Sequence, residues 1–303
     1  MNVVDFLKRC VLYGSRHGWF NSLPDTLYLK WIYRIRMGKS LNLDDPFTFN
    51  EKIQWLKVNN RSNIYSIMVD KFLVRDYVKK KIGEEYLIPL LKVWESVEDI
   101  NLSVLPSQFV LKTTHDSGGV VICRDKADFD LQMAINKLSR SIKHDYYGES
   151  REWPYKNVKP RIIAEQYMQN EGDDELHDYK FYCFNGIPKY CHVIGSRSKD
   201  ETMDFFDMDW NRMPFTKMKT ETEAYPHDAS LTHPPISFDE MKKIASTLSK
   251  GQPFIRIDLY QINGKVFFGE ITFFPNSGFG KFFPEEWDMI LGQQINLQSG
   301  RMK

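Results

Sequence analysis

The sequence predicts an α+β protein with largely antiparallel sheets, and three observations lead to this prediction. Apolar residues recur every three or four positions through most of residues 1–85, which is the period of a helix. From residue 86 the apolar runs are short, rich in Val, Ile, Leu and aromatic residues, and separated by single helices. Asn-Gly pairs at Asn185-Gly186 and Asn263-Gly264 are typical of hairpin turns. Helices followed by hairpin-joined strands indicate an α+β fold.

Three helices are expected in the N-terminal region, at residues 26–37, 49–58 and 64–83. Thr48 or Asn50 is the candidate cap of the second helix, with Glu51 near its first turn. Gly83 is expected to end the third helix.

Strands are expected at residues 86–94, 108–114, 118–124, 161–168, 180–186 and 187–197, and at both halves of 254–274. Two further helices are expected at residues 128–143 and 237–250. The second has Ser237 and Glu240 at the spacing of a capping box. Residues 145–160 and 200–235 show little periodicity and are expected to be irregular. We expect a helical N-terminal region over 1–85, a lobe over 86–164 and a C-terminal lobe over 165–303.

Composition excludes several classes of protein. The 41 Lys and Arg residues balance 40 Asp and Glu residues, so no net basic field favours a nucleic-acid partner. Cys10, Cys123, Cys183 and Cys191 lack zinc-site spacing and suit a reducing compartment. No signal peptide and no run of 18 apolar residues is present. We expect a cytoplasmic protein, with peripheral contact to the inner face of the membrane left open.

The last hairpin carries the most informative polar residues. Arg256 and Asp258 are two apart and so point to one face, and Asp258 pairs roughly opposite residue 269 or 270. Asp258 and Glu270 are therefore expected to meet, with Thr272 one step further along that face. Such oxygen ligands suit Mg²⁺. The alternative is solvated strand residues or an ion pair with Arg256, but the apolar flanking sequence favours a bound cation.

A second candidate site is FVLKTTHDSGG, in which Lys112 interrupts an apolar run. A lysine in a buried strand before a glycine-rich loop suits a phosphate. Gly118 and Gly119 allow close backbone approach, while His115 and Ser117 add side-chain donors. The alternative is an edge-strand lysine that reaches into solvent ahead of an ordinary hairpin.

Glu165 ends the apolar run IIAEQYM and gives a third candidate. The short hinge Gln166-Tyr167-Met168 follows it, and such a hinge offers a carboxylate and backbone groups to the edge of a base. The alternative is a strand end with a solvated acid.

Taken in order, five motifs resemble the ATP-grasp superfamily. They are Lys71 in VDKF, Lys112 in FVLKTTHDSGG, Glu165 in AEQYM, Asp178 and Lys180 in DYKFYCFNG, and RID with GEIT in the last hairpin. MGKSLNLDDPFTFNEKIQWLK and FGEITFFPNSGFGKF resemble more closely its TupA-like branch, which is associated with teichuronopeptide and other surface-polysaccharide biosynthesis.

The resemblance implies an ATP-grasp fold, in which two α+β lobes clasp ATP behind the helical N-terminal region. It implies that Lys71 and Lys112 contact phosphates and that residues 115–119 form a flap over them. It places Glu165 and the backbone of Gln166 and Met168 at the adenine. The remaining ATP-binding residues that it implies are Glu171 or Asp173 at the ribose, and Asp178.

For the chemistry, the resemblance implies that Arg256 stabilises an acyl phosphate and a tetrahedral intermediate. Lys180 and Arg197 are further catalytic candidates. Asp258 and Glu270 match the metal carboxylates. Thr272 stands where the family usually has an asparagine that binds the metal, and Asn276 is a candidate to replace that asparagine as a metal ligand.

The implied activity is an ATP-dependent and Mg²⁺-dependent carboxylate-amine ligase that forms an amide through an acyl phosphate. The implied substrates are a uronic acid of a bacterial surface polysaccharide, such as a capsule, O-antigen or teichuronic-type glycan, or its precursor, and an amino-acid amine. A glycosyltransferase, a sugar kinase and a non-catalytic nucleotide-binding protein are the alternatives.

Overall fold

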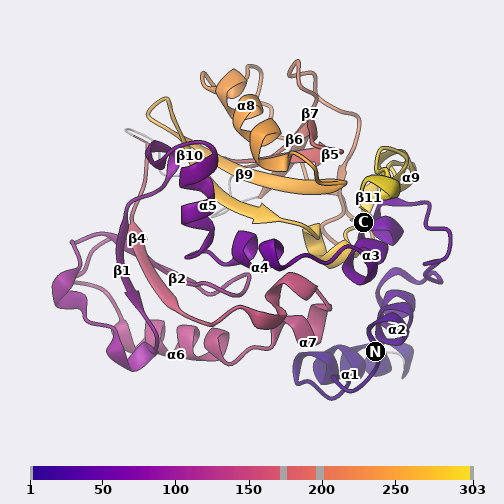
Figure 1. Ribbon diagram of the computed structural model, residues 1–303, viewed down its shortest axis with the longest axis horizontal. Helices are drawn as coiled ribbons and strands as arrows, with labels where there is room; N and C mark the ends of the chain where they lie inside the picture. The colour runs from indigo at the N-terminus through magenta and orange to yellow at the C-terminus, as the bar shows by residue number, and fades with distance from the viewer. Residues whose placement is uncertain (1–2, 171–175, 196–200, 301–303) are drawn as a thin grey trace. The chain divides into compact units, whose positions relative to one another are not determined.

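The computed structural model describes residues 3–170, 176–195 and 201–300 (Figure 1). The chain forms two compact units that alternate along the sequence. Unit 1 comprises residues 1–24, 62–77 and 87–168, and unit 2 comprises residues 25–61, 78–86 and 169–303. Each unit therefore includes part of the helical N-terminal region.

Unit 1 contains a four-stranded antiparallel sheet of order β1-β4-β2-β3. Its strands are β1(Leu90–Trp94), β2(Phe109–Thr113), β3(Val120–Cys123) and β4(Ile162–Gln166). Its helices are α1(Val3–Arg16), α4(Asn63–Val69), α6(Leu131–Ile142) and α7(Tyr146–Ser150), with 3-10 helices at Val97–Asp99, Leu102–Val104 and Trp153–Asn157. Helix α6 covers one face and buries Leu111 and Ala164 against Ala134 and Leu138. Lys112 and Glu165 alternate with Leu111 and Ala164 and so belong to the other face.

The helix expected over residues 64–83 is two helices, α4 and α5(Val74–Lys81). Asp70 causes the break, because its Oδ1 accepts hydrogen bonds from the backbone N–H of Phe72 (2.8 Å) and Leu73 (3.2 Å). Both N–H groups belong to the turn that precedes Val74, so the aspartate side chain stabilises the turn between the two helices. The prediction of one helix was therefore wrong at this point.

Unit 2 contains a five-stranded antiparallel sheet of order β10-β9-β5-β6-β7 and a small sheet of β11 and β8. Its strands are β5(Asp178–Phe184), β6(Ile187–Gly195), β7(Thr202–Phe206), β8(Thr216–Lys217), β9(Phe254–Ile262), β10(Lys265–Thr272) and β11(Phe282–Phe283). Its helices are α2(Asp25–Met37), α3(Phe49–Asn59), α8(Phe238–Ser249) and α9(Glu286–Gln293), with 3-10 helices at Glu84–Tyr86, Pro275–Gly278 and Leu297–Gly300.

Both predicted Asn-Gly hairpins are confirmed. Asn185 and Gly186 have φ values of 52° and 79°, and Asn263 and Gly264 have 50° and 78°. Positive φ at both central residues defines the turn that matches the twist of two adjoining strands.

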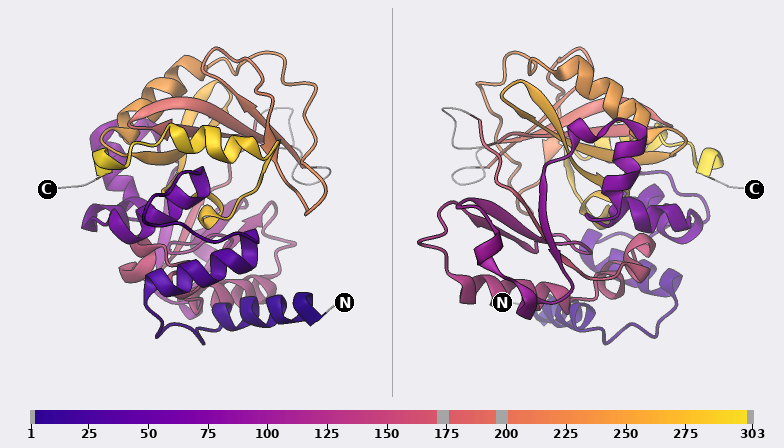
Figure 2. Two further views of the ribbon diagram at one scale, coloured as in Figure 1. Left: turned by 90° about the vertical axis from the view of Figure 1, so that its right-hand side faces the viewer. Right: turned by 60° about the vertical axis from the view of Figure 1, so that its left-hand side comes forward.

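The two faces of the five-stranded sheet differ in chemistry. Helix α8 covers one face, as Figures 1 and 2 show, and Phe238 of α8 packs on Phe181 with ring centroids 5.7 Å apart. The opposite face carries aromatic rings that surround Phe49 of α3, including Phe254 at a centroid distance of 4.9 Å. This second face also carries the charged residues of the last hairpin.

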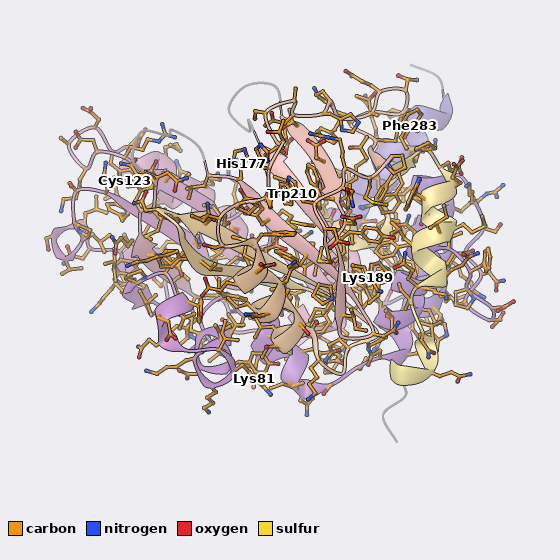
Figure 3. The ribbon with its side chains drawn as sticks, turned by 90° about the horizontal axis from the view of Figure 1, so that it is seen from above. Lys81, Cys123, His177, Lys189, Trp210 and Phe283 are labelled. Carbon is orange, nitrogen blue, oxygen red and sulfur yellow. The ribbon has the colours of Figure 1, made fainter. Side chains whose placement is uncertain are left out.

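Three local expectations need correction. Residues 200–235, expected to be irregular, contain β7 and β8, and residues 145–160 contain α7 and a 3-10 helix. Trp210, labelled in Figure 3, stacks on Phe206 of β7 at 4.2 Å. The capping box at α8 is absent, because Ser237 Oγ donates to the carbonyl oxygen of Gly264 (2.5 Å) and forms no cap hydrogen bond. Helix α3 does have a capping box, with Thr48 as the cap.

Candidate functional site

The first cluster of predicted site residues lies on the open face of the unit 1 sheet. Lys112 Nζ donates to Glu165 Oε2 at 2.6 Å, and Arg75 Nη1 donates to Glu165 Oε1 at 3.0 Å. Strand β2 lies between β4 and β3, so Lys112 is on a central strand and the edge-strand alternative was wrong. The anion that balances Lys112 in this structure is Glu165. The solvated acid proposed as the alternative for Glu165 is likewise wrong, since Glu165 is 7% exposed.

The predicted flap, residues 115–119, forms several hydrogen bonds with other residues of unit 1. Lys71 Nζ donates to the backbone oxygen of Asp116, and its backbone N–H donates to Thr114 O at 3.1 Å. The Asp116 carboxylate accepts from the hydroxyls of Thr113 and Ser141. Gly119 has no room for a side chain, since a Cβ there would lie 1.8 Å from Thr113 Oγ1.

Within the flap, Ser117 and Gly118 are exposed, whereas His115 is buried. This burial lowers the pKa of the His115 imidazole. Gly118 has a φ of 117°, which a side chain disfavours. The loop therefore presents a neutral imidazole and an exposed Ser-Gly tip.

The hinge after β4 begins at Gln166, which is exposed, and includes Met168, which is half-buried. Glu171 and Asp173, expected at the ribose, lie outside the described residues, and so does Arg197.

The second cluster lies on the β9–β10 hairpin of unit 2, and a β-bulge at Gly269 sets its register. Phe268 pairs with Leu259 and Glu270 pairs with Asp258, so Gly269 is the extra residue. The expected meeting of Asp258 and Glu270 is confirmed. A Cβ at position 269 would approach the backbone oxygen of Asp258 to 3.0 Å, so a side chain fits poorly there.

The hairpin cluster consists of Arg256, Asp258, Lys180, Glu270 and Thr272. Arg256 Nε donates to Asp258 Oδ1 (2.6 Å), and Arg256 Nη2 donates to Asp258 Oδ2 (2.7 Å), Glu270 Oε1 (3.0 Å) and Thr272 Oγ1 (3.0 Å). Lys180 Nζ donates to Asp258 Oδ2 at 2.5 Å. The ion pair with Arg256, named above as the alternative to a metal site, is therefore present.

Electrostatics in this cluster follow from burial and pairing. Burial alone would raise the pKa of Asp258, but Arg256 and Lys180 outweigh it and bring the pKa to about 2. Asp178, at the start of β5, lies 3.4 Å from Lys180 Nζ through its Oδ2. Two buried cations thus already neutralise Asp258, so the inference that the buried carboxylates require a metal was too strong.

The donor set still suits a divalent cation. Glu270 presents a side chain that is 43% exposed, opposite Asp258, with the Thr272 hydroxyl beside it. Carboxylate and hydroxyl oxygens are ligands of Mg²⁺, which usually takes one or two carboxylates together with substrate phosphates. Glu270 is the more available ligand, because both Asp258 oxygens accept from Arg256 and Lys180. Asn276 Oδ1 accepts from Lys217 Nζ at 2.8 Å.

Two residues of these clusters escaped the sequence reasoning. Arg75 lies in the segment that was read as one long helix, and it is the arginine of VDK...R...GEEYLIPLL, a stretch that resembles the TupA-like branch but to which no role was given. Lys217 lies in β8, within a segment read as irregular. Burial, together with the neighbouring charges of Arg256 and Lys180, lowers the pKa of Lys217 to about 7. The sequence offers only a weak signal for Lys217, namely a lysine within the short segment FTKMK.

Within the described ranges, no three His, Cys, Asp or Glu side chains gather as a metal site. In the same ranges, no helix is long and apolar enough to cross a membrane.

Comparison with known proteins gives one family match and several structural similarities. The family model described as TupA-like ATPgrasp matches residues 51–296. No curated protein matches the chain. Among solved structures, D-alanine–D-alanine ligase from Bacillus anthracis has 16% identity and a TM-score of 0.45 and covers 84% of this chain and 75% of that chain. The same enzyme from Helicobacter pylori has 13% identity and a TM-score of 0.40, and the match covers 82% of this chain and 69% of that chain.

Proposed function

Because the chain belongs to the TupA-like ATP-grasp family, we propose that it is an ATP-dependent ligase that joins a carboxylate to an amine. The observation that carries this proposal is the hairpin cluster, where a buried arginine is held among two carboxylates and a threonine hydroxyl. In the proposed reaction, a carboxylate oxygen attacks the γ-phosphorus of ATP, which gives ADP and an acyl phosphate. An amine then attacks the acyl carbon and phosphate leaves, so that an amide forms.

Arg256 is proposed to stabilise the negative charge that collects on the acyl oxygen. Its guanidinium is kept charged, because Asp258 and Glu270 raise its pKa against the opposing effect of burial. A cation that its neighbours already orient loses little energy to reorganisation when an oxyanion forms. Asp258 is the positioning residue for this cation, and Lys180 balances the second Asp258 oxygen.

Lys112 and Lys71 are proposed to contact the phosphates of ATP. In this proposal, Lys112 exchanges the Glu165 carboxylate for a phosphate oxygen. Glu165 would then still be balanced by Arg75, which also donates to the backbone oxygen of Ile88 at 2.8 Å. The released Glu165 oxygen becomes available as a hydrogen-bond acceptor for the amino group of adenine.

Glu270, Asp258 and Thr272 are proposed to hold Mg²⁺. When bound, this ion supplies positive charge that balances the phosphate oxygens. For the substrates we propose a uronic acid of a surface glycan or its precursor and an amino-acid amine. The support is the resemblance of the chain to the polysaccharide-associated branch of the superfamily.

A trapping assay tests the proposed function. The protein is incubated with ATP, Mg²⁺, hydroxylamine and a panel of carboxylates that includes D-glucuronate and D-galacturonate. A ligase releases ADP and phosphate and converts the uronate to a hydroxamate, because hydroxylamine captures the acyl phosphate. A phosphorylated sugar that hydroxylamine does not capture would instead identify a kinase. No nucleotide binding and no product would reject the proposal.

Peripheral contact with the membrane remains a proposal, based on Arg34, Arg36 and Lys39 at the end of α2. In the structure, Arg36 lies over the Phe279 ring at 4.8 Å and Lys39 pairs with Glu285. These contacts occupy part of the basic surface. Sedimentation with liposomes of anionic lipid should carry the protein down, and its absence from the pellet would reject the contact.

A further inference from the structure

Lys217 is a buried cation for which the described residues provide no carboxylate at ion-pair distance. Its side chain is 7% exposed. Nζ donates to Asn276 Oδ1 at 2.8 Å and lies 5.8 Å from the centroid of the Tyr182 ring. Buried lysines are normally paired with an acid, because an amide oxygen and a ring face compensate only part of the lost hydration. The amide of Asn276 and the ring of Tyr182 are therefore incomplete partners for the Lys217 amine.

The acids whose charges act on Lys217 are Asp258 and Glu201, and neither forms an ion pair with it among the described residues. Asp258 accepts from both Arg256 and Lys180, and Asp178 lies beside Lys180 at 3.4 Å. Lys217 is close enough to Arg256 and Lys180 to be influenced by their charges. Arg256, Lys180 and Lys217 thus lie close together beside the carboxylates of Asp258, Glu270 and Asp178, and they offer three basic donors to a bound oxyanion.

His192 provides an independent sign of a missing ligand. It pairs with Lys180 across β5 and β6, is 1% exposed, and stacks on Phe205 at a centroid distance of 4.4 Å. Among the described residues, neither of its ring nitrogens has a hydrogen-bond partner. A buried polar atom without a partner is destabilising, so such atoms in native proteins usually meet a ligand or a water molecule.

The loop that carries Asn276 is held in a costly conformation. Asn276 and Ser277 have φ values of 50° and 54°, a left-handed conformation that asparagine adopts readily and that is unfavourable for serine. Helix α3 holds this loop, since Lys57 Nζ donates to Ser277 O (2.8 Å) and Gln54 Nε2 donates to Gly278 O (2.8 Å). The contact between Asn276 and Lys217 is therefore fixed by the surrounding structure.

We propose that Lys217, held by Asn276 and accompanied by His192, binds the carboxylate of the substrate next to Arg256. This inference rests on the proposed function. The ligand chemistry is an oxyanion, and we assign it to the substrate carboxylate because that group must lie beside Arg256 for its acyl oxygen to be stabilised. Lys217, Lys180 and Arg256 keep 7%, 8% and 9% of their surface exposed, so a small anion can reach them.

The test compares Lys217→Met with the wild-type protein in the hydroxamate assay, using D-glucuronate or D-galacturonate as the varied carboxylate. We expect the KM for the uronate to rise at least tenfold, while the KM for ATP stays within twofold. We also expect the midpoint of thermal unfolding to equal or exceed that of wild type, because an apolar side chain of similar length replaces an unbalanced buried charge. A purely structural lysine would show the opposite pattern.

Two further variants keep the test decisive. Lys189→Met removes an exposed lysine of β6, labelled in Figure 3, and should leave every parameter unchanged. Lys217→Arg retains the cation and should restore most of the uronate affinity, and it replaces Lys217→Met if that variant does not fold.

The possible outcomes separate this inference from the proposed function. Hydroxamate formation with an unchanged uronate KM in Lys217→Met would overturn the inference and leave the ligase proposal standing. A rise in the KM for ATP alone would assign the site to a phosphate and overturn it as well. If the wild-type protein makes no hydroxamate from either uronate, the proposed uronate ligase and the inference fall together.

Discussion

Arg256 and Asp258, two residues apart on β9, form a buried double hydrogen bond of 2.6 Å and 2.7 Å. Arg256→Met should therefore lower the free energy of unfolding by about 3–5 kcal/mol, because it leaves a buried carboxylate balanced by Lys180 alone. Chemical denaturation measures this loss.

The double variant Arg256→Met/Asp258→Leu should recover at least half of that loss, since it removes both charges. An exposed pair in the same unit, Lys39 and Glu285, provides the control, and its removal should change stability by less than about 1 kcal/mol. Equal losses in the single and double Arg256 variants would show that Asp258 is not the reason for the destabilisation.

Glu270→Gln should abolish most turnover without unfolding the protein. Glutamine keeps the oxygen that accepts from Arg256, and the side chain is 43% exposed, so stability should stay within about 0.5 kcal/mol of wild type. Hydroxamate formation should fall roughly 100-fold, with ATP binding still measurable. Glu286→Gln, on the exposed surface of α9, is the matched control. Full activity in Glu270→Gln would remove Glu270 from the metal site.

Lys112→Met should weaken ATP binding by at least about tenfold, because it removes a charged hydrogen-bond donor proposed to contact phosphate. Calorimetric titration with ATP and Mg²⁺ measures the change. Lys92→Met, an exposed lysine on β1 of the same sheet, should bind ATP as wild type does. Unaltered ATP affinity in Lys112→Met would limit the role of Lys112 to its ion pair with Glu165.

His144 should give unit 1 a stability that depends on pH. Its ring nitrogen lies 2.9 Å from Glu149 Oε2, and this hydrogen bond raises the pKa of His144 against the opposing effect of burial. A histidine with a raised folded-state pKa stabilises the fold below its unfolded pKa, about 6.5, and loses this contribution as pH rises through the folded value.

Denaturation of wild type and His144→Gln between pH 5.5 and 8.5 measures that dependence. The variant should be less stable at the acidic end by up to about 1 kcal/mol, and the difference should shrink as pH rises. A constant difference across the range would exclude titration of His144 as its cause.

Much of the fold followed from short-range patterns. Helices α2, α3, α6 and α8 and both Asn-Gly hairpins lie where periodicity and turn chemistry predict them. The sequence-based predictions were wrong where a side chain forms its hydrogen bond with a residue outside its own helix. Ser237 has the sequence of a cap, yet its hydroxyl bonds to Gly264, which is 27 residues away. Asp70, inside a continuous apolar period, ends one helix and stabilises the turn before the next.

The sequence by itself determined that Arg256 and Asp258 share a face, because alternation along a strand needs no knowledge of its partners. It left residue 269 or 270 open as the partner of Asp258. Only the tertiary structure decided for Glu270, through the bulge at Gly269. Likewise, only packing revealed which charges compensate one another. Glu165 balances Lys112, and Arg256 and Lys180 balance Asp258, whereas among the described residues Lys217 has the amide of Asn276 and the ring of Tyr182 but no ion pair. Such pairing depends on distances between strands and loops far apart in sequence, and local residue patterns do not encode those distances.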